Sequence, residues 1–329
     1  MADVDALHEW KVEANRLGKA KIPFLFLLDF ELKKPWICAL SKLPEDVLFK
    51  LGHKKNYKLT SKKSKPLHFT ISPIEYQEYK DKFDFALNEI LYGNSFLLNL
   101  TIKTEIFTNY SLKELFYAAH AKYKLYFDNQ FCVFSPETFI KIENNQIKTY
   151  PMKGTIDARI PDAKKQILED KKETAEHATI VDLLRNDLSQ IANDVKVNRY
   201  RFTQQINTIH NSILQVSSEI IGNLNSNFNS QIADILIKLV PAGSVSGAPK
   251  LKTLDIIQAA EQEPRGYYTG IFGIFDGKNL DSGVMIRYVE NQNNRFFYRS
   301  GGGITYRSES LKEFQECLDK VYVPVNRKY

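Results

Sequence analysis

Hydrophobic and polar residues alternate along the chain in a pattern that predicts both helices and short strands. Residues 4–17 have the spacing of an amphipathic helix, and the apolar runs Phe24 to Phe30 and Trp36 to Leu40 predict two strands joined by a turn. Short turns between neighbouring strands favour antiparallel sheets, so the pattern predicts an α+β fold rather than a doubly wound α/β fold. The same reasoning predicts helices at Ser72 to Tyr92 (with Ser72 and Glu75 as a capping box), Ser111 to Lys122, Leu251 to Glu261 and from Ser308 onward. It predicts strands at Phe96 to Ile106, Leu125 to Phe134, Ser282 to Glu290 and Phe296 to Ser300, together with a strand beginning near Asn207 and one ending at Phe275. Residues 41–66 are predicted to be a loop-rich stretch.

One long helix, predicted from Lys165 to Ile191, carries acids on its apolar face. Apolar residues recur at helical spacing in its second half, and Glu173, Glu176 and Asp187 fall on the same side. A carboxylate that faces a packed interior needs a positive partner. Two carboxylates one turn apart suit a hard cation such as Mg²⁺, although a basic residue of the same helix could pair with them instead. The pattern by itself leaves both interpretations open.

Composition indicates a chain that can bury a large core. It has 329 residues, of which 43% are apolar, and a formal net charge of +6. The first residues lack the basic start and apolar segment of a signal peptide. The longest apolar run, Ile22 to Phe30, contains Pro23 and Asp29 and is too short to span a bilayer. Three widely spaced cysteines argue against a disulfide framework or a zinc site, so we expect a cytoplasmic protein without a membrane partner.

The run Lys54 to Lys65 contains six lysines and no acid, which makes it a possible anionic-surface or nucleic-acid site. A lysine-rich loop is more often simply solvated, and Tyr57 is the one aromatic residue there that could stack on a base. A nucleic-acid-binding module is therefore the alternative outside enzymes, and we expect no nucleic-acid partner.

Several polar residues interrupt the apolar strands at points where chemistry is possible. Glu137 lies at a turn between two apolar strands, which suits either a general acid with a raised pKa or a surface turn acid. Lys153 precedes Gly154 at a strand end, where a partly desolvated amine could act as a nucleophile or simply snorkel to solvent. His210 could be a base, a hydrogen-bonding contact or a structural histidine.

Two glycine-containing segments could hold an anion. The loop Leu239 to Lys250 is rich in small residues and leads into a helix, although its spacing does not match a Walker loop. Gly301-Gly302-Gly303 ends a strand and would let backbone amides approach a carboxylate. On the last helix, Glu313 and Glu316 lie opposite the apolar stripe, so the pattern alone would place them in water.

These motifs together resemble the chorismate-utilising family, which includes anthranilate synthase component I, isochorismate and salicylate synthases, and aminodeoxychorismate synthase component I. The resemblance implies one catalytic domain over residues 1–329 with a shortened N-terminal part, about residues 1–70. It also implies two packed antiparallel sheets flanked by outer helices. The matching segments are Ser135-Pro136-Glu137, Pro151-Met152-Lys153-Gly154-Thr155, Glu173-Thr174-Ala175-Glu176-His177, Asp182 to Asp187, Pro241 to Lys250, Pro264-Arg265-Gly266, Arg287 and Gly301-Gly302-Gly303-Ile304.

The resemblance also implies roles for individual residues. Glu173 with Glu176, and Glu313 with Glu316, match two pairs that bind Mg²⁺, which reverses the solvent-facing interpretation of the last helix. Glu137 matches the general acid that protonates the departing 4-hydroxyl of chorismate. The residues matched to substrate contacts are Arg287, Tyr268 and the backbone of Gly302 and Gly303 for the enolpyruvyl carboxylate, Ser244 where relatives often carry Thr, Lys320 near the ring carboxylate, and His210 near the ring.

Two positions sort the members of this family. Anthranilate synthases carry Ala at the position of Lys153, whereas aminodeoxychorismate synthases carry Lys, which attacks C2 of chorismate. Isochorismate and salicylate synthases use a lysine to activate water where this chain has Leu97. The resemblance is therefore strongest to the aminodeoxychorismate synthase branch of 4-aminobenzoate and folate synthesis, with anthranilate synthase as the alternative. No glutaminase pattern occurs in this sequence, which implies that ammonia comes from solution or from a separate glutamine amidotransferase subunit.

Overall fold

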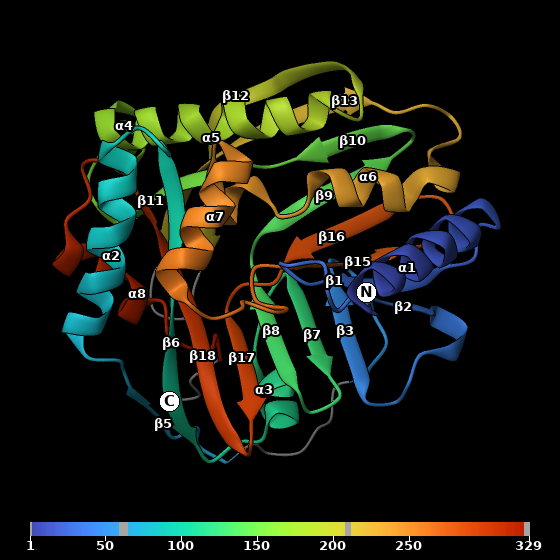
Figure 1. Ribbon diagram of the computed structural model, residues 1–329, viewed down its shortest axis with the longest axis horizontal. Coiled ribbons are helices and arrows are strands. Elements are labelled where there is room, and N and C mark those ends of the chain that lie inside the picture. The colour runs from blue at the N-terminus through green and yellow to red at the C-terminus, as the bar shows by residue number, and fades with distance from the viewer. Residues whose placement is uncertain (1, 59–64, 208–211, 326–329) are drawn as a thin grey trace.

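The strands form two large antiparallel sheets, which confirms the predicted α+β fold (Figure 1). The computed structural model describes residues 2–58, 65–207 and 212–325. The first sheet has long strands near one edge and buried strands farther in. Its spatial order is β11 (Met152–Asp157), β13 (Ser212–Asn223), β10 (Gln146–Thr149), β9 (Thr138–Glu143), β16 (Leu280–Val284), β15 (Ile271–Phe275), β1 (Phe24–Leu28) and β2 (Trp36–Ala39), with β12 (Asn193–Asn207) paired to β13.

The second sheet packs against the first through large apolar side chains. Leu25 and Phe272 of the first sheet share one buried cluster with Phe49, Leu125 and Phe131 of the second. Burial of aromatic and aliphatic side chains from both sheets holds the two layers together. The second sheet runs in the order β14 (Gly247–Ala248), β6 (Leu97–Thr108), β18 (Arg295–Ile304), β17 (Tyr288–Gln292), β8 (Phe131–Ser135), β7 (Tyr123–Phe127), β3 (Val47–Leu51) and β4 (Lys54–Lys55), with β5 (Phe69–Ser72) paired to β6.

The helices cover the outer sides of the sheets, as the resemblance implied. In Figure 1, α1 and α6 lie on the right against the first sheet, and α2 and α8 lie on the left against the second. The long helix α5 packs on β11, β12 and β13. The helices are α1 (Ala2–Lys19), α2 (Tyr76–Leu91), α3 (Leu112–Ala118), α4 (Ala163–Glu169), α5 (Lys171–Ser189), α6 (Ile232–Leu239), α7 (Lys250–Glu261) and α8 (Ser310–Asp319).

The prediction of one continuous helix from Lys165 to Ile191 is wrong. The segment forms α4 and α5, separated at Asp170, whose backbone is extended with φ −61° and ψ 116°. The Asp170 carboxylate accepts a hydrogen bond of 2.9 Å from the backbone N–H of Glu173. Asp170 therefore caps a new helix, and the acids Glu173 and Glu176 lie in its first two turns rather than in mid-helix.

Other boundaries differ because turns lie inside segments that were predicted to be continuous. The Leu125 to Phe134 segment is a hairpin that turns at Asp128 and Asn129, both at positive φ. The strand predicted at Ser282 to Glu290 is interrupted at Arg287, which has a φ of 53°. Further differences are that Ser72 ends strand β5 instead of capping α2, that α3 stops at Ala118, and that residues 41–66 include strands β3 and β4.

Arg265 ties the helical layer to the second sheet through a buried ion pair. Its side chain is 1% exposed and makes two hydrogen bonds, of 2.6 and 2.8 Å, to the carboxylate of Glu261 in α7. It also donates to the carbonyls of Asn99 in β6 and Val245, at 2.6 and 2.8 Å. The same Glu261 carboxylate accepts from the N–H of Thr101 at 2.9 Å. One buried cation thus fixes α7, β6 and the loop that contains Val245.

We expect Arg265→Met to lower the free energy of unfolding by about 3–5 kcal/mol, because it leaves the buried Glu261 carboxylate without its cation. Removing both charges, in Arg265→Met/Glu261→Met, should cost less than the single change. Urea unfolding followed by circular dichroism measures both values. Arg295→Met, which breaks the exposed pair with Glu105, is the matched control and should change stability by less than about 1 kcal/mol. Equal losses in the single and double variants would show that the ion pair is not what holds these elements.

Candidate active site

The glycines at the end of β18 form the floor on which the predicted site residues meet. β18 pairs with β6 so that Gly302 lies opposite Leu100 and Gly303 opposite Asn99. A Cβ atom at Gly303 would lie 3.3 Å from both the Lys153 Nζ and the Leu97 Cδ1 atoms. The absence of a side chain therefore lets a lysine from β11 and a leucine from β6 approach the strand directly.

The first acid pair lies over Lys153 and Gly154. The Glu176 carboxylate is 3.5 Å from the Lys153 ammonium, with both side chains only partly exposed. Gly154 has a φ of 83°, and a Cβ atom there would lie 3.0 Å from Glu173 Oε2. Glycine is therefore needed at Gly154 both for its left-handed backbone and for the close approach of α5. β11 and α5 together bring the predicted nucleophile beside the first acid pair.

The second acid pair approaches the same strand from α8. A Cβ atom at Gly302 would lie 3.4 Å from Glu313 Oε2 and 3.9 Å from Glu316 Oε1. Lys320 donates to Glu316 at 2.6 Å and to the carbonyl of Gly301 at 2.8 Å. Glu313 is buried, at 7% exposure, so the interpretation that it points into water is wrong for this residue. The Glu316 side chain is 53% exposed, so for Glu316 the interpretation holds. The short helix packs on β18, and this contact buries Glu313.

Glu137 lies close enough to both lysines to be influenced by their charges. Burial raises the pKa of its carboxyl, whereas a hydrogen bond from the Ser244 hydroxyl and the positive charges of Lys153 and Lys320 oppose that increase. The net effect is a raised pKa, which holds more of the carboxyl in its protonated form. A general acid has to be protonated before it can donate a proton, so the raised pKa suits Glu137 to that role.

Arg287 and Tyr268 flank the same region. The Arg287 guanidinium donates a 2.8 Å hydrogen bond to the carbonyl of Lys320 and lies over the Tyr322 ring, 4.8 Å from its centroid. Tyr268 is 3% exposed and packs against Tyr288. The left-handed backbone of Arg287 redirects the chain between β16 and β17, and this bend places the guanidinium beside the end of α8.

The acid pairs have the right donors for a hard cation, but they do not form one compact cluster. In the parts of the chain that the structure describes, no three His, Cys, Asp or Glu side chains group closely enough to hold one metal ion. Each pair supplies carboxylate oxygens only, which are the ligands Mg²⁺ prefers, and that ion commonly keeps waters and an anionic ligand as further partners. The residues present fit a cation that an anion and water help to coordinate.

Several residues of the predicted motifs make contacts that hold elements of the fold together. Asp187 is buried and pairs with Lys250 at 2.9 Å, which fixes α5 to the start of α7. His177, which lies in a matching segment but was given no role from the sequence, is fully buried and bonded to the Ser218 hydroxyl at 2.7 Å. Burial is the main reason why the pKa of His177 is lowered to about 4, and nearby Arg201 and Lys153 add to the effect. His210 and residues 59–64 of the lysine-rich run lie outside the described residues.

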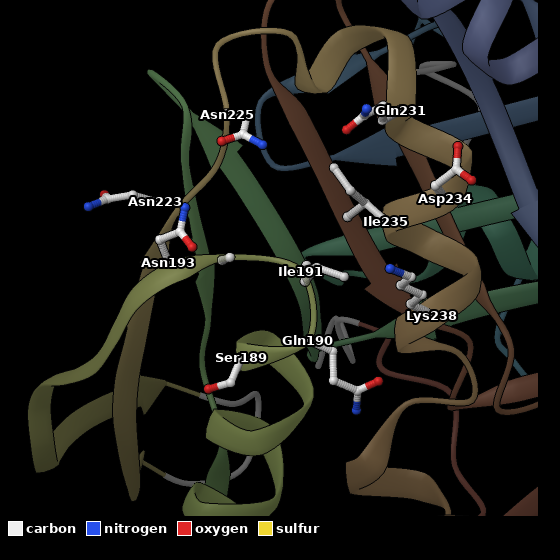
Figure 2. A pocket seen from close by; sticks show the side chains of 11 residues that line it. Ser189, Gln190, Ile191, Asn193, Asn223, Asn225, Gln231, Asp234, Ile235 and Lys238 are labelled. Atoms are coloured by element: carbon white, nitrogen blue, oxygen red, sulfur yellow. The ribbon is translucent and has the colours of Figure 1, made fainter.

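A cavity of about 280 Å³ lies away from these residues, at the C-terminal end of α5 (Figure 2). Side-chain amides from three stretches of the chain, residues 189–193, 223–225 and 231–238, line it, and none of the predicted site residues reaches it. Figure 2 shows Gln190 and Lys238 on facing sides, and Asn193, Asn223 and Asn225 at the other end. A smaller cavity borders Glu137 and Ser244. The candidate active site is therefore identified by how its side chains are arranged, and not by the size of the cavity beside it.

Known proteins resemble this chain over between about half and nearly all of its length. It is 50% identical over 314 residues to an uncharacterized PabA-like protein of Haemophilus influenzae, with 95% of each chain covered. The aminodeoxychorismate synthase component 1 of Escherichia coli is 33% identical over 197 residues, which are 57% of this chain and 42% of that enzyme. The anthranilate synthase component 1 of Aquifex aeolicus is 34% identical over 196 residues, which are 56% of this chain and 38% of that enzyme.

Solved structures share the fold. Anthranilate synthase component I of Streptococcus pneumoniae superposes with a TM-score of 0.67 at 26% identity, covering 78% of this chain and 59% of that one. The menaquinone-specific isochorismate synthase of Escherichia coli gives a TM-score of 0.73 at 15% identity, covering 97% and 81%. No helix in the described residues combines the length and hydropathy needed to cross a bilayer. The sequence matches the family described as chorismate binding enzyme over residues 24–326, and the chain belongs to that family.

Proposed function

We propose that the chain is an aminodeoxychorismate synthase component I, which converts chorismate and ammonia to 4-amino-4-deoxychorismate and water. The observation that carries the proposal is the position of Lys153, whose amine lies between the Glu176 carboxylate and Gly303. Identity to the two kinds of synthase is nearly equal, 33% and 34%, so overall similarity does not separate the reactions. A primary amine at the floor of the site supports amination at C4 by way of a covalent bond to the enzyme.

The proposed reaction uses two residues of this chain. The unprotonated Lys153 amine forms a bond to C2 of chorismate, the two conjugated ring double bonds shift, and the C4–O bond breaks as Glu137 gives its proton to the departing hydroxyl, which leaves as water. Ammonia then bonds to C4, both double bonds shift back, and the C2–N bond to Lys153 breaks. After the amine and Glu137 regain their starting protonation states, no oxidant or reductant has been needed.

Substrate contacts are proposed for the residues around this centre. Arg287, Tyr268 and the backbone N–H groups of Gly302 and Gly303 would bind the enolpyruvyl carboxylate, with Arg287 supplying the charge. Lys320 would lie near the ring carboxylate, because its ammonium already spans Glu316 and Gly301. Ser244 would orient the Glu137 carboxyl through the hydrogen bond that the two make.

Charge balance supports Mg²⁺ as a cofactor. The carboxylates of Glu173, Glu176, Glu313 and Glu316 outnumber the ammonium groups of Lys153 and Lys320 by two near the glycine floor. Chorismate would add two more negative charges. When bound, Mg²⁺ would supply positive charge between the acids and the ring carboxylate of the substrate.

We expect turnover to require Mg²⁺, and Glu173→Ala or Glu316→Ala to reduce it at least about a hundredfold while the protein stays folded. Each change removes a carboxylate from one of the pairs, so the cation and substrate carboxylate lose an anchor. Steady-state rates across a Mg²⁺ titration and circular dichroism of each variant measure both effects. Glu169→Ala, an exposed acid of α4, is the control and should behave like wild type. Full activity in excess chelator would contradict the cofactor assignment.

Glu137→Gln should lower kcat by roughly 10²–10⁴ with little change in KM, because proton donation to the leaving group occurs only in the transition state. In the wild type, activity should fall as pH rises through the raised pKa of Glu137, since deprotonation removes the donor. This alkaline limb should be absent in Glu137→Gln. Glu143→Gln, an exposed acid of the same strand β9, serves as control. An unchanged kcat would reject Glu137 as the general acid.

Lys153→Ala should lose most 4-amination, because the covalent nucleophile is gone. Incubating wild-type protein with chorismate and Mg²⁺ without ammonia should produce a mass adduct on the peptide that contains Lys153, and the variant should lack it. Lys164→Ala, an exposed lysine of α4, should keep both the adduct and the activity.

Product analysis with ammonium salt separates this proposal from its alternative. Fluorescent anthranilate as the wild-type product would assign the chain to the anthranilate synthases, and a wild-type rate of aminodeoxychorismate formation in Lys153→Ala would show that Lys153 is only a structural residue.

A further inference from the structure

Lys153 lies in a β-bulge of strand β11. The strand pairs with β13 on either side of Lys153 and Gly154, but these two residues face a single residue of that partner strand, Val216. A bulge inserts an extra residue, bends the strand and redirects its side chains. The direction of the Lys153 side chain therefore depends on what holds this bulge in place.

Ser218 of β13 anchors the strands on both of its sides. Its backbone N–H donates to the carbonyl of Pro151, two residues before Lys153, at 3.0 Å, and the Ser217 hydroxyl donates to the same carbonyl at 3.2 Å. The Ser218 hydroxyl accepts a hydrogen bond of 2.9 Å from the backbone N–H of Arg201, where β12 has a bulge of its own and φ is 46°. One buried serine thus holds β11 just before its bulge and β12 at the bulge itself.

His177 of α5 joins this anchor from the helical layer. Its Nε2 atom lies 2.7 Å from the oxygen of the Ser218 hydroxyl, and its ring meets the ring of Tyr200 in β12 edge to face, with 5.9 Å between the centroids. His177 directly follows Glu176, whose carboxylate is 3.5 Å from the Lys153 ammonium. Helix α5 is therefore tied to the sheet at two neighbouring points, one through Glu176 and one through His177.

The polarity of His177 needs an explanation, because its side chain is 0% exposed. Within the described residues, its Nδ1 atom has no hydrogen-bond partner. A buried nitrogen without a partner destabilises the fold, so an apolar ring would be the more stable choice if packing were its only purpose. The polar contact that the imidazole makes in return is the hydrogen bond to Ser218.

We propose that His177 is a positioning residue for Lys153. Through its hydrogen bond to Ser218, it holds α5 against the strand that anchors the bulge, and this keeps the Lys153 amine at the depth that the candidate site requires. The inference rests on the proposed function, in which that amine must reach C2 of chorismate. A displacement of about 1 Å is enough to lower a reaction rate strongly, even when its cause lies away from the reacting atoms.

The test compares His177→Phe, which keeps a ring against Tyr200 but has no nitrogen, with His177→Gln, whose amide can take the place of Nε2. One readout is the rate at which the peptide that contains Lys153 gains the mass of the chorismate adduct without ammonia, at a Mg²⁺ concentration that saturates each variant. The other readout is kcat and KM with ammonium chloride.

His177→Phe should lower the adduct rate and kcat by about tenfold or more, because the Lys153 amine loses its alignment. KM for chorismate should stay within about twofold of wild type, since Arg287 and Lys320 lie on other elements. His177→Gln should recover most of the lost rate.

Ser218→Ala breaks the same hydrogen bond from the strand side, so the test stays decisive if His177→Phe does not fold. The double variant should lose no more than the slower single variant, because both changes remove one interaction. Asn15→Leu is the matched control. It removes the side-chain hydrogen bonds that tie α1 to α6, near edge strand β2 and at the opposite end of the first sheet from β11 (Figure 1), and it should leave both rates unchanged.

A wild-type adduct rate and kcat in folded His177→Phe, or a loss that His177→Gln does not recover, would overturn the positioning role while the proposed function stands. Losses that multiply in the double variant would also overturn it, since His177 and Ser218 would then act separately. A wild-type protein that forms no adduct on Lys153 would instead reject the proposed function, and the role of His177 with it.

Discussion

The guanidinium of Arg265 has to be paired, because it is almost completely removed from water. Its partners are Glu261, the carbonyl of Asn99 and the carbonyl of Val245, which come from three different elements. Breaking any one of these contacts would leave part of a buried charge unsatisfied. The positions of α7, of β6 and of the loop around Val245 are therefore coupled through a single side chain.

This coupling reaches the candidate active site by two short routes. Ser244 directly precedes Val245 and donates its hydroxyl hydrogen to Glu137, so the loop held by Arg265 also positions the candidate general acid. Asn99 lies two residues after Leu97, which forms the wall beside Lys153. An ion pair without any chemical role thus fixes both the acid and the apolar wall of the site. The packing of the fold and the geometry of the candidate site therefore depend on the same buried ion pair, which explains why a structural motif lies among the candidate site motifs in the sequence.

The sequence predicted the kinds of element better than their ends. Apolar periodicity located most helices and strands, but it did not show the turn at Asp128 and Asn129 or the break at Arg287. Aspartate and asparagine adopt positive φ comparatively often, so residue type rather than periodicity indicates the first turn, whereas arginine at positive φ is uncommon. Strand β3 was missed although four of its five residues are apolar, because the run is short and most of the surrounding segment, residues 41–66, is polar. Its pairing with β7, from far along the chain, is what identifies it as part of the sheet.

For the site, the sequence supplied the residue types and the structure supplied their partners. The acids of α5 were predicted from their place on an apolar face, whereas the pairing of Glu176 with Lys153 depends on how α5 crosses β11. Burial of Glu313 was missed by periodicity alone, because α8 packs on β18 with a face that carries both acids and apolar residues. The inward position of His177 had no such signal, since a single histidine in a helix gives no indication of which element it bonds.

The glycines of β18 act differently from what their sequence alone suggested. They were expected to expose backbone amides to a carboxylate, and that role stays a prediction. Their visible effect is steric: at Gly302 and Gly303 the missing side chains leave room for the acids of α8, for Leu97 and for Lys153. A methyl group at Gly303 would lie 3.3 Å from the Lys153 Nζ and the Leu97 Cδ1 atoms, so each of them would have to shift by a few tenths of an ångström. The depth of the Lys153 amine is thus permitted by a strand that has no side chain at that point. The acids on α5 and α8 reach the same region because Gly154, Gly302 and Gly303 leave space there.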